Sequence, residues 1–179
     1  MSAQALTAAS TIKRTQGYVK EALDLSTQAV ALDPKFSAGL SNHAVNLVIT
    51  GNFKDGISYF QDAASANVRS AQPYWWMAVA LRDAGQFKDA VTNFKIAITK
   101  IDNDNTLVGA DVARGTKSLL VYDLAKTYWL AGNDADGLKT LDQAMQIDPG
   151  IKAFLKNDLA KYGNFKSLAG NAQFDAYLK

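Results

Sequence analysis

The sequence predicts an all-α fold made of helical hairpins that are copied along the chain. Four glycines, Gly17, Gly51, Gly85 and Gly132, follow one another at intervals of 34, 34 and 47 residues. Similar residues surround each glycine, and a repeat of this period is typical of stacked helical hairpins. The chain has 179 residues, 48% of them hydrophobic, and accommodates about five hairpins in a single domain. This organisation directs the search for function to a shared surface and away from a catalytic pocket.

Each repeat is predicted to contain one helix, a glycine turn and a second helix. The first helix carries apolar residues at helical spacing, as in Leu40, Ala44 and Leu47. Glycine ends this helix because it adopts positive φ without a steric penalty. Four residues later, in the first turn of the second helix, stands an acid that the helix dipole favours: Glu21, Asp55, Asp89 or Asp136. Small residues five and twelve positions after the glycine let the helices approach closely: Ala22, Gly56, Ala90, Gly137, Ala29, Ala63, Ala97 and Ala144. Pro34 and Pro149 stop the second helix of two units.

This series resembles the tetratricopeptide repeat, in a bacterial-type form with a closing helical segment. The resemblance covers roughly residues 3 to 149. It implies a right-handed superhelical array of antiparallel helical hairpins in a single domain, residues 1–179. We expect hairpins at about 3–34, 37–68, 71–101 and 109–148, with capping helices over 150–179. The usual role of such arrays is to bind peptides or proteins in the concave groove.

Three segments depart from the repeat. The stretch before Gly17 matches poorly, so the first helix is either an N-terminal cap or the cut edge of a longer array. Thirteen extra residues fall around 102–118, and we interpret them as a longer loop plus an extension of the next helix from near Gly109. After Pro149 the pattern changes, and Gly163, Phe165, Leu168 and Phe174 lie in a segment expected to cover the last apolar face. This segment leads us to expect that the true C-terminus is present.

The residues argue against an enzyme or a metal protein. The chain has no cysteine and one histidine, His43, which we expect to be a partly buried packing residue because no second ligand joins it. Asp102, Asp104 and Asn105 resemble the start of a calcium loop, but Leu107 and Ala113 stand where that loop needs glycine and glutamate. A solvated polar loop fits better. We therefore expect neither cofactor nor metal.

Charge and hydropathy narrow the possible partners. The net charge of +2 is too small, and the lysines are too scattered along the sequence, for a nucleic-acid-binding surface to be expected. No apolar run approaches the ~20 residues of a membrane span, and the first residues lack the order of a signal peptide. We expect a soluble protein, with the choice between cytoplasm and periplasm left open.

The resemblance implies that the first helix of each hairpin lines the concave groove. The lining residues stand about thirteen, ten, six and three positions before each glycine. They are Ala38, Ser41, Val45 and Val48; Gln72, Trp75, Val79 and Arg82; and Leu119, Tyr122, Lys126 and Trp129. The first helix would offer Gln4, Thr7, Thr11 and Arg14. Ser41, Trp75 and Tyr122 replace the lysine that some family members use to hold a chaperone tail, so we do not expect that ligand.

Two functional hypotheses follow. In the first, Trp75, Tyr122 and Trp129 anchor an apolar segment of a protein partner, and Arg82 and Lys126 favour acidic flanks on it. Any one of these aromatics is as well explained by core packing, and adjacent Trp75 and Trp76 point about 100° apart on a helix. In the second, the array is a structural module that forms an oligomer, or joins a larger complex, through its hairpin ends.

Overall fold

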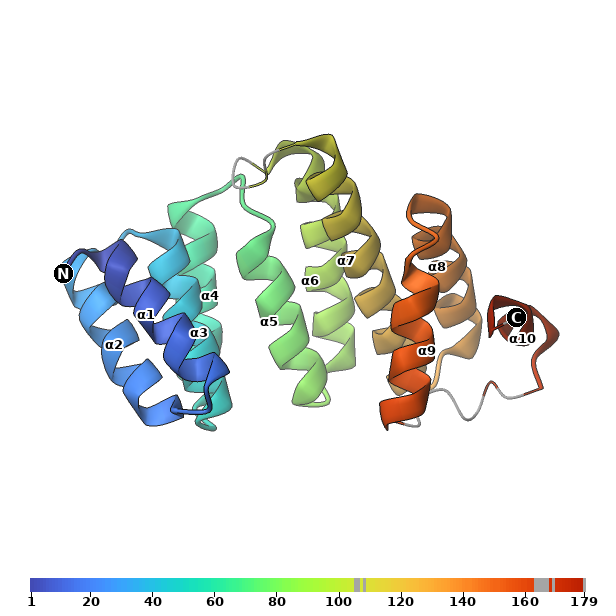
Figure 1. Ribbon diagram of the computed structural model, residues 1–179, viewed down its shortest axis with the longest axis horizontal. Coiled ribbons are helices and arrows are strands. Elements are labelled where there is room, and N and C mark those ends of the chain that lie inside the picture. Colours follow the sequence, from blue (N-terminus) through green and yellow to red (C-terminus); the bar gives the residue numbers. More distant parts are fainter. Residues whose placement is uncertain (105–106, 108, 163–167, 169, 179) are drawn as a thin grey trace.

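A row of paired helices builds the protein in its computed structural model (Figure 1). The structure describes residues 1–104, 107, 109–162, 168 and 170–178, and of residues 160–162 and 173 the backbone alone. Within these residues the regular secondary structure is entirely helical. Successive helices pack against one another from the N-terminus to the C-terminus. The predicted all-α array of antiparallel helical hairpins is confirmed.

Four hairpins form the body of the array. They pair α1 (Ala3–Thr15) with α2 (Val19–Leu32), α3 (Ser37–Ile49) with α4 (Phe53–Ala66), α5 (Gln72–Asp83) with α6 (Phe87–Lys100), and α7 (Ala110–Leu130) with α8 (Asp134–Ile147). A short 3₁₀ helix, η1 (Ile101–Asn103), follows α6. Two further helices, α9 (Ile151–Tyr162) and α10 (Ala172–Leu178), close the C-terminal side.

The glycine of each hairpin turn is required by the backbone and not by packing. Gly51 has φ of 88°, and a Cβ built on it meets no atom within 4 Å. The turn is a Schellman motif, in which the Asn52 N–H donates to the Leu47 carbonyl at 2.8 Å and the Gly51 N–H to Val48 at 3.0 Å. The left-handed backbone therefore selects glycine at this position.

The recurrent small residues lie where the two helices of a hairpin touch. Ala44 and Ala78, seven positions before a turn glycine, have no exposed surface. In the second hairpin, a Cβ on Gly56 would lie 2.7 Å from Cγ2 of Val48 and 3.1 Å from the Ala44 carbonyl. A larger residue at Ala44 or Gly56 would push α3 and α4 apart.

His43 is a buried packing residue with one hydrogen bond. Its Nδ1 lies 2.9 Å from Oγ of Ser26, and its ring meets Tyr59 edge-on with centroids 4.6 Å apart. Beside it, the side-chain amide of Asn46 donates to Ser26, to Ser10 and to the Ala22 carbonyl. This buried polar cluster joins α1, α2 and α3, so it contributes to the register of the first two hairpins.

The inserted residues attach the third hairpin to the fourth. The Asp104 carboxylate accepts the Ala71 N–H at 2.5 Å, and Asp102 pairs with Lys117 on α7 at 2.8 Å. Both acids of the calcium-like sequence thus have partners within the protein, while Asn105 lies outside the described residues. Gly109, with φ of 95°, caps the N-terminus of the long helix α7.

The closing segment covers the apolar end of the array. Ile151 and Leu155 of α9 and Phe174 of α10 are buried in one cluster with residues of α7 and α8. Leu168, which precedes α10, joins the same cluster. Gly163 and Phe165, which the sequence also assigns to this segment, lie outside the described residues.

Candidate functional site

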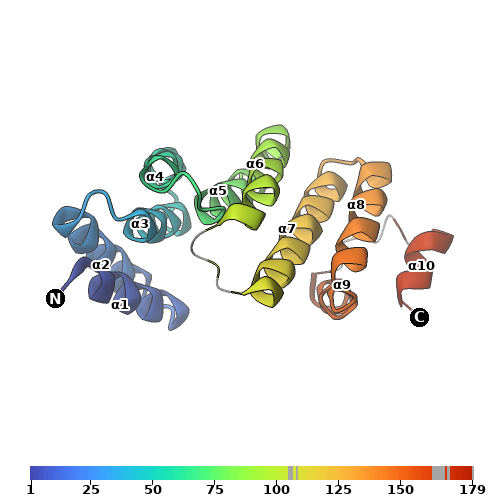
Figure 2. The same cartoon turned by 90° about the horizontal axis from the view of Figure 1, so that it is seen from above.

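The odd-numbered helices form a continuous row along one side of the array. Contacts run from α1 to α3, from α3 to α5, from α5 to α7 and from α7 to α9. In Figure 2, α4 lies above α3 and α6 lies above α5, so these second helices leave the lower side of the row open. The surface built from the first helices of the hairpins is therefore shared by all hairpins.

Two adjoining hollows open along α1, α3 and α5, and together we call them the N-terminal groove. The first is about 280 Å³ and is lined by Thr7, Thr11, Arg14, Ala38, Ser41, Asn42, Val45, Gln72 and Trp76. The second is about 200 Å³ and is lined by Arg14, Val45, Val48, Ile49, Phe60, Trp76, Val79, Ala80 and Asp83. The residues common to both are Arg14, Val45 and Trp76, so these three stand at the junction of the hollows.

Of the two adjacent tryptophans, it is Trp76 that lines the groove. Its ring is stacked on that of Trp75, with centroids 5.8 Å apart and planes 11° from parallel. Trp75 turns towards α7, where its indole N–H donates to Oδ2 of Asp123 at 3.0 Å. The sequence identified Trp75 as the anchor because of its repeat position. The structure shows that its neighbour is the indole beside both hollows.

Asp123 neutralises the cation that the sequence assigned to the middle of the groove. Its Oδ1 lies 3.2 Å from Nη1 of Arg82, whose side chain is only 11% exposed. Nε of Arg82 pairs with Asp83, also at 3.2 Å. Arg82 therefore has two carboxylates from its own chain, and its role as a free receptor for acidic flanks is not supported.

Lys126 is likewise paired within the chain. Its ammonium lies 2.8 Å from Oδ2 of Asp158 on α9, and the same oxygen accepts the hydroxyl of Tyr122 at 3.0 Å. The lysine also stands over the Tyr122 ring, 5.5 Å from its centroid. Burial, and then the charge of Asp158, raise the pKa of Tyr122 well above its ordinary value. The phenol thus remains a neutral hydrogen-bond donor.

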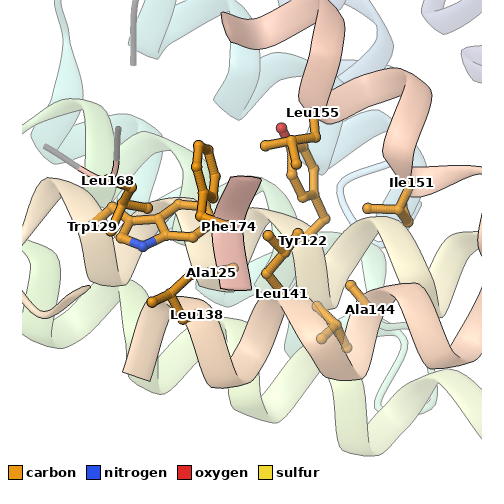
Figure 3. Packing of buried hydrophobic residues seen from close by; sticks show 11 residues of the cluster. Tyr122, Ala125, Trp129, Leu138, Leu141, Ala144, Ile151, Leu155, Leu168 and Phe174 are labelled. Carbon is orange, nitrogen blue, oxygen red and sulfur yellow. The ribbon is translucent and has the colours of Figure 1, made fainter. Parts of the chain in front are cut away.

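Tyr122 and Trp129 lie in the interior and not on an open surface (Figure 3). They are 4% and 8% exposed. Trp129 packs edge-on against Phe174 of α10, with ring centroids 6.3 Å apart, and Leu138 and Leu168 belong to the same cluster. Leu119 is partly buried against the same cluster. The three predicted aromatic anchors therefore do not form one exposed surface, because Tyr122 and Trp129 belong to the core.

The predicted groove residues on α3 and α5 lie in a different environment from those on α7. Val45, Val48 and Val79 are partly exposed and line the N-terminal groove. Gln72, which is exposed, and Ser41, which is 3% exposed, also belong to its lining. The structure thus brings Ser41, Val45, Val48, Gln72 and Val79 together, and separates them from Leu119, Tyr122, Lys126 and Trp129.

Arg14 is the cation that lies in the groove. Its Nε is buried without a hydrogen-bond partner, and no ion pair joins it to any residue that the structure describes. Burial lowers the pKa of Arg14 from its ordinary value, yet an arginine remains charged at neutral pH. The guanidinium is therefore a positive charge at the junction of the two hollows.

Solved structures with the same architecture decide the fold. Pseudomonas aeruginosa PilF superposes with a TM-score of 0.74 at 12% identity, over 98% of this chain and 72% of PilF. MamA gives 0.65 at 18% identity, over 94% of this chain and 88% of MamA. YrrB, described as a tetratricopeptide protein with an unusual peptide-binding site, gives 0.61 at 20% identity, over 82% of this chain and 69% of YrrB.

The chain has the tetratricopeptide-repeat fold. No family model and no curated protein sequence matches it, and these low identities establish the architecture alone. Proteins of this fold are generally interaction scaffolds. In the described residues, no cluster of three metal-ligating side chains occurs and no helix is both long and apolar enough to cross a membrane.

Proposed function

We propose that this tetratricopeptide array is a non-enzymatic adaptor that binds a peptide or helical segment of a partner protein in the N-terminal groove. The observation that carries the proposal is Trp76, a partly exposed indole beside both hollows. Val45, Val48 and Val79 extend its apolar surface across α3 and α5. A concave apolar surface with one large aromatic side chain is typical of a binding hot spot.

Other hollows lack this chemistry. A hollow of about 380 Å³ opens beside Phe53, between the second and third hairpins, and one of about 490 Å³ opens beside Pro34, against the second hairpin. Among the described residues that line them there is no tryptophan and no arginine. The fold of YrrB, whose description mentions a peptide-binding site, also supports a peptide as the ligand.

Selection from a random-peptide display library tests this function. Peptides selected on the wild-type chain are synthesised, and their affinities are measured for wild type and for Trp76→Ala. We expect a loss of about tenfold or more, because hot-spot truncations cost on the order of 2 kcal/mol. Tyr18→Ala is the matched control, since Tyr18 is an aromatic residue 54% exposed outside the groove. Unchanged affinity in Trp76→Ala would refute the groove as the binding site.

The alternative function is assembly, and one observation favours it. Ile12 on α1 and Leu32 on α2 are 56% and 60% exposed, which leaves apolar surface on the first hairpin. An array that associates through this hairpin would be an oligomer in light scattering, and Ile12→Asp would convert it to a monomer. A monomer at high concentration would instead favour the adaptor.

A further inference from the structure

Arg14 differs from Arg82 and Lys126, the other two cations expected in the groove, because no carboxylate of the described residues pairs with it. Arg82 is held by Asp123 and Asp83, and Lys126 by Asp158. For Arg14 no comparable partner exists among the described residues, and its Nε has lost contact with water without gaining a hydrogen bond. Such a group is energetically costly. The charge of the guanidinium remains without a counter-ion, and a carboxylate ligand is the group that can pair with it through charge-assisted hydrogen bonds.

The two hollows that meet at Arg14 differ in chemistry. The first has a mixed lining, in which hydroxyl and amide side chains such as Thr11, Ser41 and Gln72 stand beside apolar ones. The hydroxyl of Ser41 is buried and has no hydrogen-bond partner among the described residues. The second hollow is lined mainly by apolar side chains such as Val48, Ile49 and Val79. A ligand that crosses the junction therefore passes from a mixed surface, which offers polar partners, to a more apolar one.

The acid in the lining of these hollows is paired with another cation. Asp83 lines the second hollow, but its carboxylate is exposed and is the one that pairs with Nε of Arg82. The junction consequently carries an uncompensated positive charge beside an indole. Electrostatic complementarity then favours a partner that brings a negative charge to this point.

On the basis of the function proposed above, we infer that Arg14 selects an acidic side chain within the bound segment. The ligand class is a peptide with an internal Asp or Glu, polar residues on one side of it and large apolar residues on the other. The acid is internal and not a C-terminal carboxylate, because a hollow continues on each side of Arg14. The apolar side chains lie beside Trp76, and the carboxylate binds the guanidinium.

The display selection described above supplies the probe. Each selected peptide is synthesised with its acid intact, with the acid replaced by the corresponding amide, and in a form truncated to end at that position. Affinities are measured at low and high salt for wild type, Arg14→Gln, Arg14→Lys and the control Arg69→Gln. Arg69 is an exposed arginine in the connection between α4 and α5.

We expect the selected peptides to share an internal acid. Arg14→Gln and the acid-to-amide change should each weaken binding about tenfold, with no further loss when combined, and salt should weaken only the intact pair. Arg14→Lys should retain part of the affinity. Peptides that respond to Trp76→Ala but not to Arg14→Gln would overturn the role of Arg14 and leave the groove intact. Full binding of the truncated peptide would overturn the internal position, and failure to select any Trp76-dependent peptide would overturn both proposals.

Discussion

The indole N–H of Trp75 donates a 3.0 Å hydrogen bond to Asp123, which joins the third hairpin to the fourth. The second oxygen of Asp123 accepts from Arg82 at 3.2 Å. Two residues that the sequence assigned to ligand binding are therefore engaged within the array. The row of odd-numbered helices is consequently divided into two parts. The N-terminal part holds the open N-terminal groove, and the C-terminal part is cross-linked by its own side chains.

Asp123 should therefore contribute to stability. In Asp123→Ala, the Trp75 indole loses its acceptor and the largely buried Arg82 keeps only the exposed Asp83. We expect the free energy of unfolding to fall by about 1–3 kcal/mol, measured by urea denaturation. Asp24→Ala, at an exposed position on α2, is the control and should change it by less than about 0.5 kcal/mol. Equal effects in the two variants would show that the cross-link is energetically neutral.

Trp129 and Trp76 should have opposite effects on stability and binding. Trp129→Ala leaves a cavity under Phe174 and should cost about 3–5 kcal/mol of unfolding free energy. The milder Trp129→Phe keeps the chain folded, and it should bind selected peptides with wild-type affinity. Trp76→Ala should lose peptide affinity and should cost less unfolding free energy than Trp129→Ala, because Trp76 is only partly buried against its cluster. Loss of peptide affinity in folded Trp129→Phe would show that Trp129 contributes to peptide binding.

The hairpin architecture was predictable because it depends on local chemistry. A glycine such as Gly51 is needed for positive φ, and small residues such as Ala44 and Ala78 are needed at the helix contact. These requirements recur in every repeat, so they leave a periodic signal in the sequence. The role of the C-terminal segment as a cover for the last apolar face follows from the same logic, because an unpaired apolar face must be buried.

The surface was less predictable because it depends on pairings across long sequence separations. The partners Arg82 and Asp123 are on different hairpins, and Asp158, the partner of Lys126, is on the closing helix α9. Nothing in the repeat positions shows that these charges cancel. Trp75 and Trp76 are adjacent, and repeat position alone could not decide which of them lines a hollow. The acid Asp123, three residues before Lys126 on the same helix, was the available signal that this lysine has partners.

Two helical glycines offer a matched test of packing. A Cβ on Gly137 would overlap the Trp129 indole, whereas one on Gly115 meets no atom within 4 Å. Gly115→Ala should therefore raise the free energy of unfolding by about 0.5–1 kcal/mol through helix propensity. Gly137→Ala should lower it by about 1–3 kcal/mol through overpacking. Thermal melts show whether each variant is more or less stable than the wild type. A stabilising Gly137→Ala would mean that the Trp129 indole moves aside freely.

His43 should make stability depend on pH in a defined window. Burial lowers its pKa below the ordinary value of about 6.5, so the folded state holds the neutral ring. As the pH falls through about 6.5 the unfolded chain binds a proton first. The stabilisation is thus complete above that pH and is lost towards the lowered pKa of the folded state.

Melting temperatures between pH 8 and pH 5.5 check this expectation. His43 is the only histidine, and carboxylates titrate mainly below about pH 5, so the decline on acidification should come from this side chain. His43→Gln removes the titrating group, and its melting temperature should stay nearly flat over the same range even if it is lower throughout. Parallel curves for the two proteins would show that His43 is protonated with equal ease in the folded and unfolded states, contrary to its burial against Ser26 and Tyr59.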